Sequence, residues 1–435
     1  MVVGVFLDIS GAFDNLRWNI LIRDMMTLGA SDATRSIIQS YLTGRRAVLS
    51  VEGATAFADL TRGCPQGSQL GPSLWNLSMD RALVTNNDDR VKLVAYADDL
   101  AVLIAGSDIL DIQGRALRDW AELRGLTFSA SKSQAIPLKG GLRSGFTVSF
   151  GAQDIVAVDS VRYLGVELDS KRNFWAHVSI ESESLYSRLR AASSADWGLR
   201  QSTSAVIYRA VFLPHITYAA ETWAKGVLTK KAIRLLGSKQ RRALRSLTGA
   251  YSTTSTDALQ VVAGQLPLDL EIRWHVVRTR RKAGQISEEV MSDQWDRLLD
   301  IWQDRWDSSV KSRWTYGIFS DIRRRLVLPL EVDHYVCQFL TGHGDFNSKL
   351  ESFNLRGEAM CRWETEDESV DHVLYRCPLL SAERDRVIRQ IGEDVWPCET
   401  KVFMDTRSNY CALRRFAREA IEAKRSSDRL GLVPG

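Results

Sequence analysis

The chain has 435 residues, too many for one ordinary hydrophobic core, so we expect two or three domains. Its 45% hydrophobic and 25% charged residues are typical of a globular protein. The net charge is only +4, so the chain as a whole is not strongly basic, and bulk charge alone does not indicate a nucleic-acid-binding protein. No apolar run reaches the length of about 18 residues that a membrane span needs. The six cysteines are too scattered for a disulfide framework, which favours a reducing intracellular compartment.

The first 170 residues alternate between strand and helix patterns and predict an α+β domain. Short apolar runs rich in Val, Ile and Phe predict strands, and apolar residues spaced by three or four predict helices. The predicted elements, in chain order, are a buried strand at 2–7, helices at 15–28 and 31–42, a hairpin at 45–61, a loop at 62–72, a helix at 72–84, a hairpin of 91–96 with 100–105, a helix at 110–124, a strand at 127–128 and a strand pair within 145–168.

Beyond residue 169 the apolar spacing becomes helical. We therefore expect an α+β domain over 1–170, a helical domain over 171–285 and a mostly helical region over 286–435. Trp295, Trp302 and Trp306 share one helical face with two leucines. We interpret that stripe as core or partner interface rather than as a cofactor site.

Three acidic residues stand where strands end. Asp8 follows the opening apolar run, while Asp98 and Asp99 lie at the tip of the second predicted hairpin. Carboxylates held close together repel one another, and a hard divalent cation such as Mg²⁺ is the usual remedy. An Asp pair in a tight turn is common, however, so this pattern alone also fits an ordinary turn.

Five segments in order give these acids a context. They are Asp8 with Ala12-Phe13-Asp14, then 63–67 (GCPQG), 96–99 (YADD), 125–128 (GLTF) with Lys132, and 163–165 (YLG). This order resembles the palm motifs of reverse transcriptases, in the version of the type-one, ribosomal-DNA-inserting non-LTR retrotransposons of insects. The similarity extends to 218–223, 251–255 and 342–344. It implies a polymerase palm, an antiparallel sheet with helices on one face, followed by a helical thumb.

The resemblance also implies roles at the acidic centre. Asp8, Asp98 and Asp99 would hold two Mg²⁺ ions that support nucleotidyl transfer. Lys132 would act as the acid for the leaving pyrophosphate, although a lone surface lysine is otherwise a solvated charge. Phe13 would lie beneath the sugar and exclude a ribose 2′-hydroxyl.

Further roles concern the substrates. Gln66, Gly67 and Tyr96 would contact the incoming dNTP, with the glycine allowing the backbone to approach closely. Tyr163 and Gly165 belong to a turn that would grip the primer strand.

Basic residues cluster on the predicted helices despite the small net charge. Arg241, Arg242 and Arg245 lie in the densest cluster, 230–245, and others follow at 278–282 and 323–325. A thumb helix that follows the phosphate backbone of template and primer is one interpretation. A solvated helix face balanced by nearby acids is the other.

A Cys/His segment lies near the end of the chain. Cys361, Glu364, His372 and Cys377 match the spacing of the family's zinc knuckle, except that Glu364 replaces its second cysteine. A carboxylate can bind Zn²⁺, but the change weakens the case for a structural site. Bound Zn²⁺ and a degenerate, metal-free knuckle both stay open.

The function implied is an RNA-directed DNA polymerase that acts in the nucleus during target-primed reverse transcription. Its partners would be an RNA template, a DNA primer or target and dNTPs, with no membrane partner; the oligomeric state is open. The resemblance alone implies that the region 286–435, with its degenerate knuckle at 361–377, binds nucleic acid and is associated with an endonuclease. A catalytically incompetent nucleic-acid-binding remnant and a maturase- or telomerase-like polymerase are the alternatives. The family's fingers region would precede Met1, so we expect the isolated chain to polymerise poorly.

Overall fold

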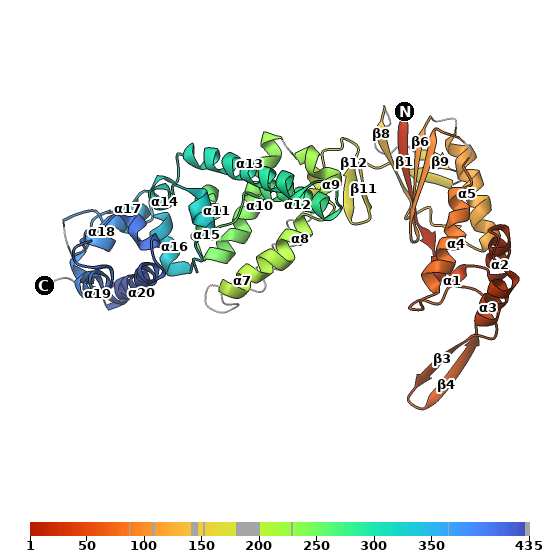
Figure 1. Ribbon diagram of the computed structural model, residues 1–435, viewed down its shortest axis with the longest axis horizontal. Coiled ribbons are helices and arrows are strands. Elements are labelled where there is room, and N and C mark those ends of the chain that lie inside the picture. Colours follow the sequence, from red (N-terminus) through yellow and green to blue (C-terminus); the bar gives the residue numbers. More distant parts are fainter. Residues whose placement is uncertain are drawn as a thin grey trace. The chain divides into compact units, whose positions relative to one another are not determined.

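The computed structural model describes residues 1–86, 88–106, 109–140, 147–150, 153–179, 201–227, 229–363 and 365–430. The chain divides into two compact units, Met1–His177 and Val178–Gly435. Unit 1 mixes helices with antiparallel strands and unit 2 is helical, as the α+β prediction required (Figure 1). No helix among the described residues has both the length and the apolar character to cross a bilayer. The further division expected at residue 285 stays a prediction.

The described part of unit 1 includes five small sheets and five helices. These elements are β1 (Val2–Leu7), β2 (Ile9–Ser10), α1 (Ala12–Asn15), α2 (Trp18–Thr27), α3 (Asp32–Leu42), β3 (Arg46–Val51), β4 (Ala54–Asp59), α4 (Gly71–Leu83), β5 (Val91–Tyr96), β6 (Asp99–Ala105), α5 (Leu110–Arg124), β7 (Thr127–Phe128), β8 (Gln134–Lys139), β9 (Thr147–Phe150), β10 (Gln153–Val156), β11 (Ser160–Tyr163) and β12 (Val166–Asp169).

The largest sheet has the order β5-β6-β1-β8, and its pairings are all antiparallel. Strand β1 lies in the middle and is buried on both faces, which explains why it reads as a continuous apolar run. Val5 and Leu7 face a core shared with α4 and α5, which lie on one side of the sheet (Figure 1). Phe6 faces the opposite side and packs with Ile136 and Val161.

Most predicted elements of unit 1 are confirmed, and three need correction. The helix expected at 15–28 begins only at Trp18, as α2, because extended backbone at Leu16 and Arg17 separates it from the short α1. The strand pair expected within 145–168 is two successive hairpins. Strand β8 was missed, because Pro137 breaks its apolar run and argues against a strand.

The β3–β4 hairpin stands apart from the body of unit 1 (Figure 1). All twelve of its strand residues are exposed, including Leu49 at 65% and Phe57 at 66%. An isolated two-stranded hairpin is marginally stable in water, so its pairing alone contributes little to the fold.

Unit 2 is built from helices and short helical turns. Its helices are α7 (Gln201–Ile207), α8 (Leu213–Ile216), α9 (Ala220–Trp223), α10 (Lys230–Thr248), α11 (Thr256–Ala263), α12 (Leu268–Lys282), α13 (Glu288–Asp307), α14 (Arg313–Ile318), α15 (Ile322–Val327), α16 (His334–Thr341), α17 (Asn347–Glu351), α18 (Val370–Tyr375), α19 (Ser381–Ile391) and α20 (Arg407–Leu430). A π-helical turn, Tyr208–Phe212, joins α7 to α8, and 3₁₀ turns lie at Ala224–Val227, Pro378–Leu380 and Thr400–Met404.

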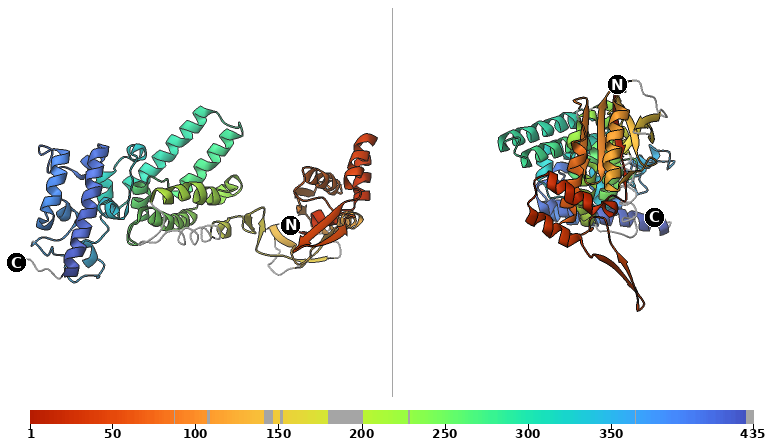
Figure 2. Two further views of the ribbon diagram at one scale, coloured as in Figure 1. Left: turned by 90° about the horizontal axis from the view of Figure 1, so that it is seen from below. Right: turned by 90° about the vertical axis from the view of Figure 1, so that its right-hand side faces the viewer.

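Tryptophans build much of the core of unit 2. Trp302 and Trp306 of α13 are 2% and 1% exposed, which confirms the core interpretation of the stripe. The ring of Trp295 lies 4.7 Å from that of Trp274, so α12 and α13 pack side by side (Figure 2). At the other end of the core, α20 packs against α16 and α19.

One buried ion pair joins helices α2 and α5 of unit 1. An Arg124 Nη atom donates to a carboxylate oxygen of Asp24 at 2.5 Å, and the two side chains are 4% and 8% exposed. Burial lowers the pKa of Arg124, which the neighbouring Asp24 opposes. Removing the carboxylate would leave an uncompensated buried cation.

We therefore expect Asp24→Ala to lower the free energy of unfolding by about 3–5 kcal/mol. Asp111→Ala is the matched control, because its pair with Arg115 is exposed and worth about 0–1 kcal/mol. Urea denaturation of the two variants measures both values. Equal losses would contradict the assignment of Asp24 as a structural anchor.

Candidate active site

The three acidic residues named from the sequence come together through strand register. Leu7, the last residue of β1, pairs with Leu100 of β6, so Asp8 follows directly beside Asp99. Tyr96 pairs with Asp99 across the β5–β6 hairpin, which leaves Ala97 and Asp98 as its two-residue turn. Side chains from two segments about ninety residues apart therefore meet at one end of the sheet.

The turn that carries Asp98 has a strained backbone, which a side chain of helix α4 holds in place by a hydrogen bond. Ala97 has a φ of 51°, in the left-handed region that costs a residue with a Cβ about 1 kcal/mol or more. The indole N–H of Trp75, on α4, donates to the Ala97 carbonyl at 2.7 Å. Trp75 is 1% exposed, so the buried helix fixes the backbone on which Asp98 sits.

The electrostatics of this end suit a divalent cation. Partial burial raises the pKa of Asp99, and the nearby charges of Asp98 and Asp8 raise it further. Repulsion by its two neighbours thus opposes ionisation of Asp99, and carboxylate oxygens are the donors that Mg²⁺ or a similar ion prefers. The charge and the oxygen donors of these residues suit a divalent cation, but their carboxylate oxygens do not form a ligand set in this structure: among the described residues only Cys361, His372 and Cys377 hold ligand atoms close enough for one ion.

Lys132 is the cation nearest to this cluster that was named from the sequence. Its Nζ lies 3.7 Å from an Asp8 carboxylate oxygen, and both side chains are substantially exposed. Backbone bonds place the two residues: the Ser129 N–H donates to the Asp8 carbonyl, and the Asp8 N–H donates to the Ser133 hydroxyl. In this structure the Lys132 ammonium pairs with the Asp8 carboxylate. Because this ion pair is exposed, it stabilises the fold little.

The loop at 63–67 is fastened to the segment that follows Asp8. The Cys64 N–H donates to the Phe13 carbonyl at 2.5 Å, and the Gln66 amide donates to the Asp14 carboxylate at 3.3 Å. Gly63 has a φ of 96°, and a Cβ there would lie 2.9 Å from the Asp14 carbonyl oxygen, so only glycine fits. Phe13 packs on Trp75, with ring centroids 4.7 Å apart.

The other substrate residues named from the sequence also belong to unit 1. Tyr96 is 67% exposed beside the acids, and Gly67 has a φ of 79° with open space where a Cβ would be. Tyr163 packs on Phe6 at 4.9 Å, and burial followed by the charge of Asp99 raises its pKa. Gly165 occupies the two-residue β11–β12 turn, where a φ of 79° favours glycine.

The three arginines named from the sequence lie on α10, in unit 2, and differ in surroundings. Arg241 donates to the backbone carbonyls of Ser252 and Thr254, so part of its bonding capacity holds that loop. Arg242 is exposed, whereas Arg245 is partly buried and its Nε has no hydrogen-bond partner in the described structure.

The Cys/His segment forms a compact cluster in unit 2. Ligand atoms of Cys361, His372 and Cys377 all lie within 4.8 Å of one another, and the three side chains are buried. The His372 Nδ1 lies 3.2 Å from a Glu366 carboxylate oxygen, while its Nε2 is buried without a partner in the described structure. Glu364, named from the sequence as a fourth ligand, lies outside the described residues.

Sequence reasoning overlooked three residues that position these groups. Trp75 holds the Ala97 turn, Ser133 accepts from the Asp8 N–H, and Glu366 orients His372. Only Glu366 gave a signal, as an acid within the Cys/His segment. The partners of Trp75 and Ser133 are distant in sequence, so no spacing pattern reveals them.

The carboxylate cluster predicts cation binding by the chain itself. We expect Asp98→Asn to weaken Mn²⁺ binding at least ten-fold, because it removes one charged ligand. Electron paramagnetic resonance of free Mn²⁺ measures the affinity, with the exposed helical Asp119→Asn as control. Equal affinities for the two variants would contradict a cation site at Asp98.

Known proteins resemble this chain in sequence. Residues 2–168 match the family described as reverse transcriptase (RNA-dependent DNA polymerase). A 115 kDa protein of the type-1 retrotransposable element R1DM of Drosophila melanogaster is 30% identical over 98% of this chain and 44% of its own length. The chain spans less than half the length of that relative and of a Bradysia coprophila relative.

Among solved structures the likeness is weak: a structure of apo telomerase from Candida tropicalis has a TM-score of 0.33 at 10% identity, over 68% of this chain and 52% of that chain. Shorter relatives in sequence are covered over more of their own length. The Pol polyprotein of type-1 element R1 2 of Nasonia vitripennis is 30% identical over 74% of this chain and 87% of its own length. The chain therefore belongs to the Pol polyproteins of type-1 (R1) non-LTR retrotransposable elements and contains their reverse transcriptase region.

Proposed function

We propose that the chain supplies the catalytic centre of an RNA-directed DNA polymerase. The observation that carries this proposal is the convergence of Asp8, Asp98 and Asp99 at one end of the β5-β6-β1-β8 sheet. Its substrates would be an RNA template, a DNA primer or target with a free 3′-hydroxyl, and dNTPs. The mobile elements named jockey, whose RNA-directed DNA polymerases are 25–27% identical to this chain, support that substrate class. The nucleus is the proposed place of action.

The reaction forms a bond between the primer 3′-oxygen and the α-phosphorus of a dNTP, while the bond to pyrophosphate breaks. Asp8, Asp98 and Asp99 would hold two Mg²⁺ ions, which lower the charge on the phosphate oxygens and favour the ionised 3′-hydroxyl. The strained Ala97 turn, fixed by Trp75, keeps Asp98 in position before substrate binds. Lys132 would have to leave Asp8 to donate a proton to pyrophosphate.

Two side chains would select and orient the nucleotide. Phe13 has a fixed ring, because Trp75 packs against it, and a rigid ring beneath the sugar would clash with a 2′-hydroxyl. Gln66 would lie against the nucleotide, held by its bond to Asp14. Tyr163 and the β11–β12 turn would contact the primer, close enough to Asp99 for that charge to raise the pKa of Tyr163.

Primer extension tests this proposal. The chain, fused to the preceding region of a full-length relative, should extend a DNA primer on an RNA template with Mg²⁺ and dNTPs. Asp98→Asn should lower kcat at least a thousand-fold, because the centre loses a metal ligand, and Phe13→Ala should raise the use of ribonucleotides. Asp119→Asn should match the unsubstituted fusion. Full extension by Asp98→Asn would refute the proposed centre.

We also propose that Cys361, His372 and Cys377 bind one structural Zn²⁺. Two sulfurs on a tetrahedral Zn²⁺, with bonds of about 2.3 Å, lie about 3.8 Å apart. The observed Sγ–Sγ distance of 3.9 Å agrees with that spacing and is far too long for a disulfide. The buried Nε2 of His372 has no other partner in the described structure, and Glu366 holds the opposite ring nitrogen, as carboxylates do behind zinc-bound histidines.

Metal analysis of the purified chain tests this site. We expect about one Zn²⁺ per chain, loss of the metal in Cys377→Ala, and about 10- to 100-fold weaker binding in Glu366→Gln, which removes the charge that faces His372 and also its ion pair with Arg376. Cys411→Ala is the control, because that cysteine is exposed and outside the cluster. A chain purified without zinc that binds none on titration would refute the proposal.

A further inference from the structure

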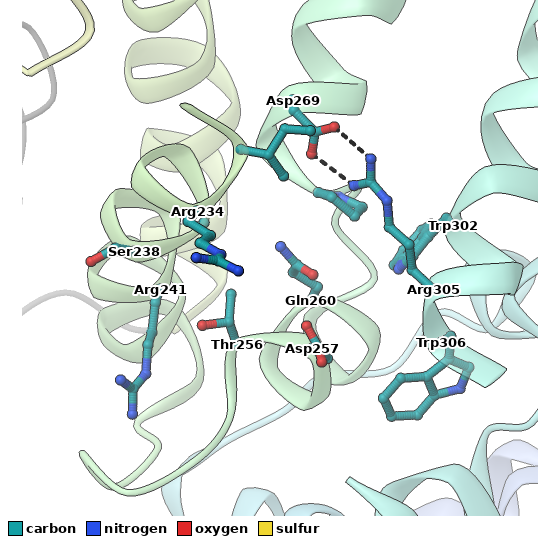
Figure 3. Close-up of a pocket in the computed structure, with 13 residues that line it drawn as sticks. Arg234, Ser238, Arg241, Thr256, Asp257, Gln260, Asp269, Trp302, Arg305 and Trp306 are labelled. Carbon is teal, nitrogen blue, oxygen red and sulfur yellow. Dashed lines mark hydrogen bonds and ion pairs between the residues drawn. The ribbon is translucent and has the colours of Figure 1, made fainter. Parts of the chain in front are cut away.

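Two neighbouring cavities of unit 2 form one groove along the amino end of α11. The first, of about 380 Å³, lies between α10, α11 and α13, and the second, of about 550 Å³, is lined by residues from 241 to 353. They share Arg241, Thr256 and Asp257, so they adjoin one another at these residues. Figure 3 shows Arg234 and Arg241 on one side of the first cavity, with Trp302 and Trp306 on the other.

The second cavity is positively charged. Its lining includes Arg241, Lys311 and Lys349, against the single carboxylate of Asp257. Within the described structure neither lysine forms an ion pair, and Arg241 donates its hydrogen bonds to uncharged backbone carbonyls. Asp257 accepts a hydrogen bond from Ser309 at 2.7 Å, so its charge is partly satisfied. The cavity thus holds cations that lack an anionic partner.

The surroundings of His343 also reflect the positive charge of the second cavity. It lines the cavity, and its Nδ1 lies 3.2 Å from the Thr253 hydroxyl, which joins the segments 251–255 and 342–344 noted in the sequence. Burial lowers the pKa of His343 to about 4, and the charges of Lys349 and Arg241 contribute to that shift. The two cations that contribute to this shift favour an anion in the cavity.

An aromatic ring completes the site. Phe353 is 39% exposed and lines the same cavity, with the Lys349 ammonium 5.2 Å from its centroid. The His343 ring lies 6.3 Å from it. A partly exposed ring beside unpaired cations is the combination that single-stranded nucleic acids use, with bases stacked on the ring and phosphates on the cations. A duplex, whose bases are already stacked, cannot use the ring.

We infer that this groove binds single-stranded nucleic acid, with backbone phosphates at Arg241, Lys311 and Lys349 and one unstacked base on Phe353. The inference rests on the proposed function only for the class of ligand. It involves none of the carboxylates of the candidate active site, so either assignment can fail without the other.

Fluorescence anisotropy of a labelled single-stranded oligonucleotide tests the groove, with the whole chain and no added Mg²⁺. Lys311→Gln/Lys349→Gln should lower the slope of log affinity against log salt by about 1.4, because each lost phosphate contact on a single strand contributes about 0.7. Phe353→Ala should bind about ten-fold more weakly, and Phe353→Trp should bind as the unsubstituted chain does. A duplex of equal length and free dNTPs should compete poorly.

The matched control is Lys92→Gln/Lys171→Gln, which removes the same charge from exposed positions in unit 1. If the groove variant and this control have equal salt slopes, or if Phe353→Ala keeps full affinity, the inference is wrong. Lys311→Gln alone, at an exposed and unpaired residue, should lower the slope by about 0.7, and it decides the question if the double variant does not fold. Asp98→Asn should bind the oligonucleotide normally, which separates this site from the polymerase centre.

Discussion

The antiparallel pairing of β1 with β6 is the constraint on which the acidic centre depends. Because side chains alternate along a strand, a shift of one residue in this register would turn Asp8 away from the hairpin that carries Asp98 and Asp99. Strand β1 is paired on both sides, with β6 and with β8, so a slip would have to break two sets of backbone hydrogen bonds. The pairing of the central strand thus determines where the charges meet.

The cluster is unfavourable without a ligand. Three carboxylates repel one another, and Ala97 adds backbone strain that the buried Trp75 counters with its hydrogen bond. Strain and repulsion held in place by a rigid core are typical of sites prepared for a ligand. Sequence similarity independently assigns the chain to a family of reverse transcriptases, which is consistent with a strained, charged site prepared for a ligand.

Sequence reasoning recovered what depends on local pattern and missed what depends on distant partners. The strand before Asp8 and the hairpin around Asp98 follow from apolar runs, and the helix over 110–124 has the predicted bounds. Strand β8 was missed because it contains a proline. A strand at the edge of a sheet can contain a proline, but only the assembled sheet shows that β8 lies at the edge. The roles of Trp75 and Glu366 arise from contacts between elements, which no spacing rule describes.

In unit 2, too, contacts between segments distant in sequence could not be predicted. The basic cluster at 230–245 was visible in the sequence, but the structure shows that Arg241 meets Lys311 and Lys349 from segments far along the chain. Charge that appears scattered in sequence is gathered in space by the packing of α10, α11 and the segments that follow. The small net charge of the whole chain hides this local excess.

Whether Asp8 and the two hairpin aspartates share divalent cations can be measured by crystallography. In a crystal grown with Mn²⁺, with data collected at the manganese absorption edge, we expect an anomalous peak within bonding distance of carboxylate oxygens from both Asp8 and Asp98. Carboxylates of Asp8 and Asp98 too far apart to share an ion, with manganese bound elsewhere or not at all, would contradict it.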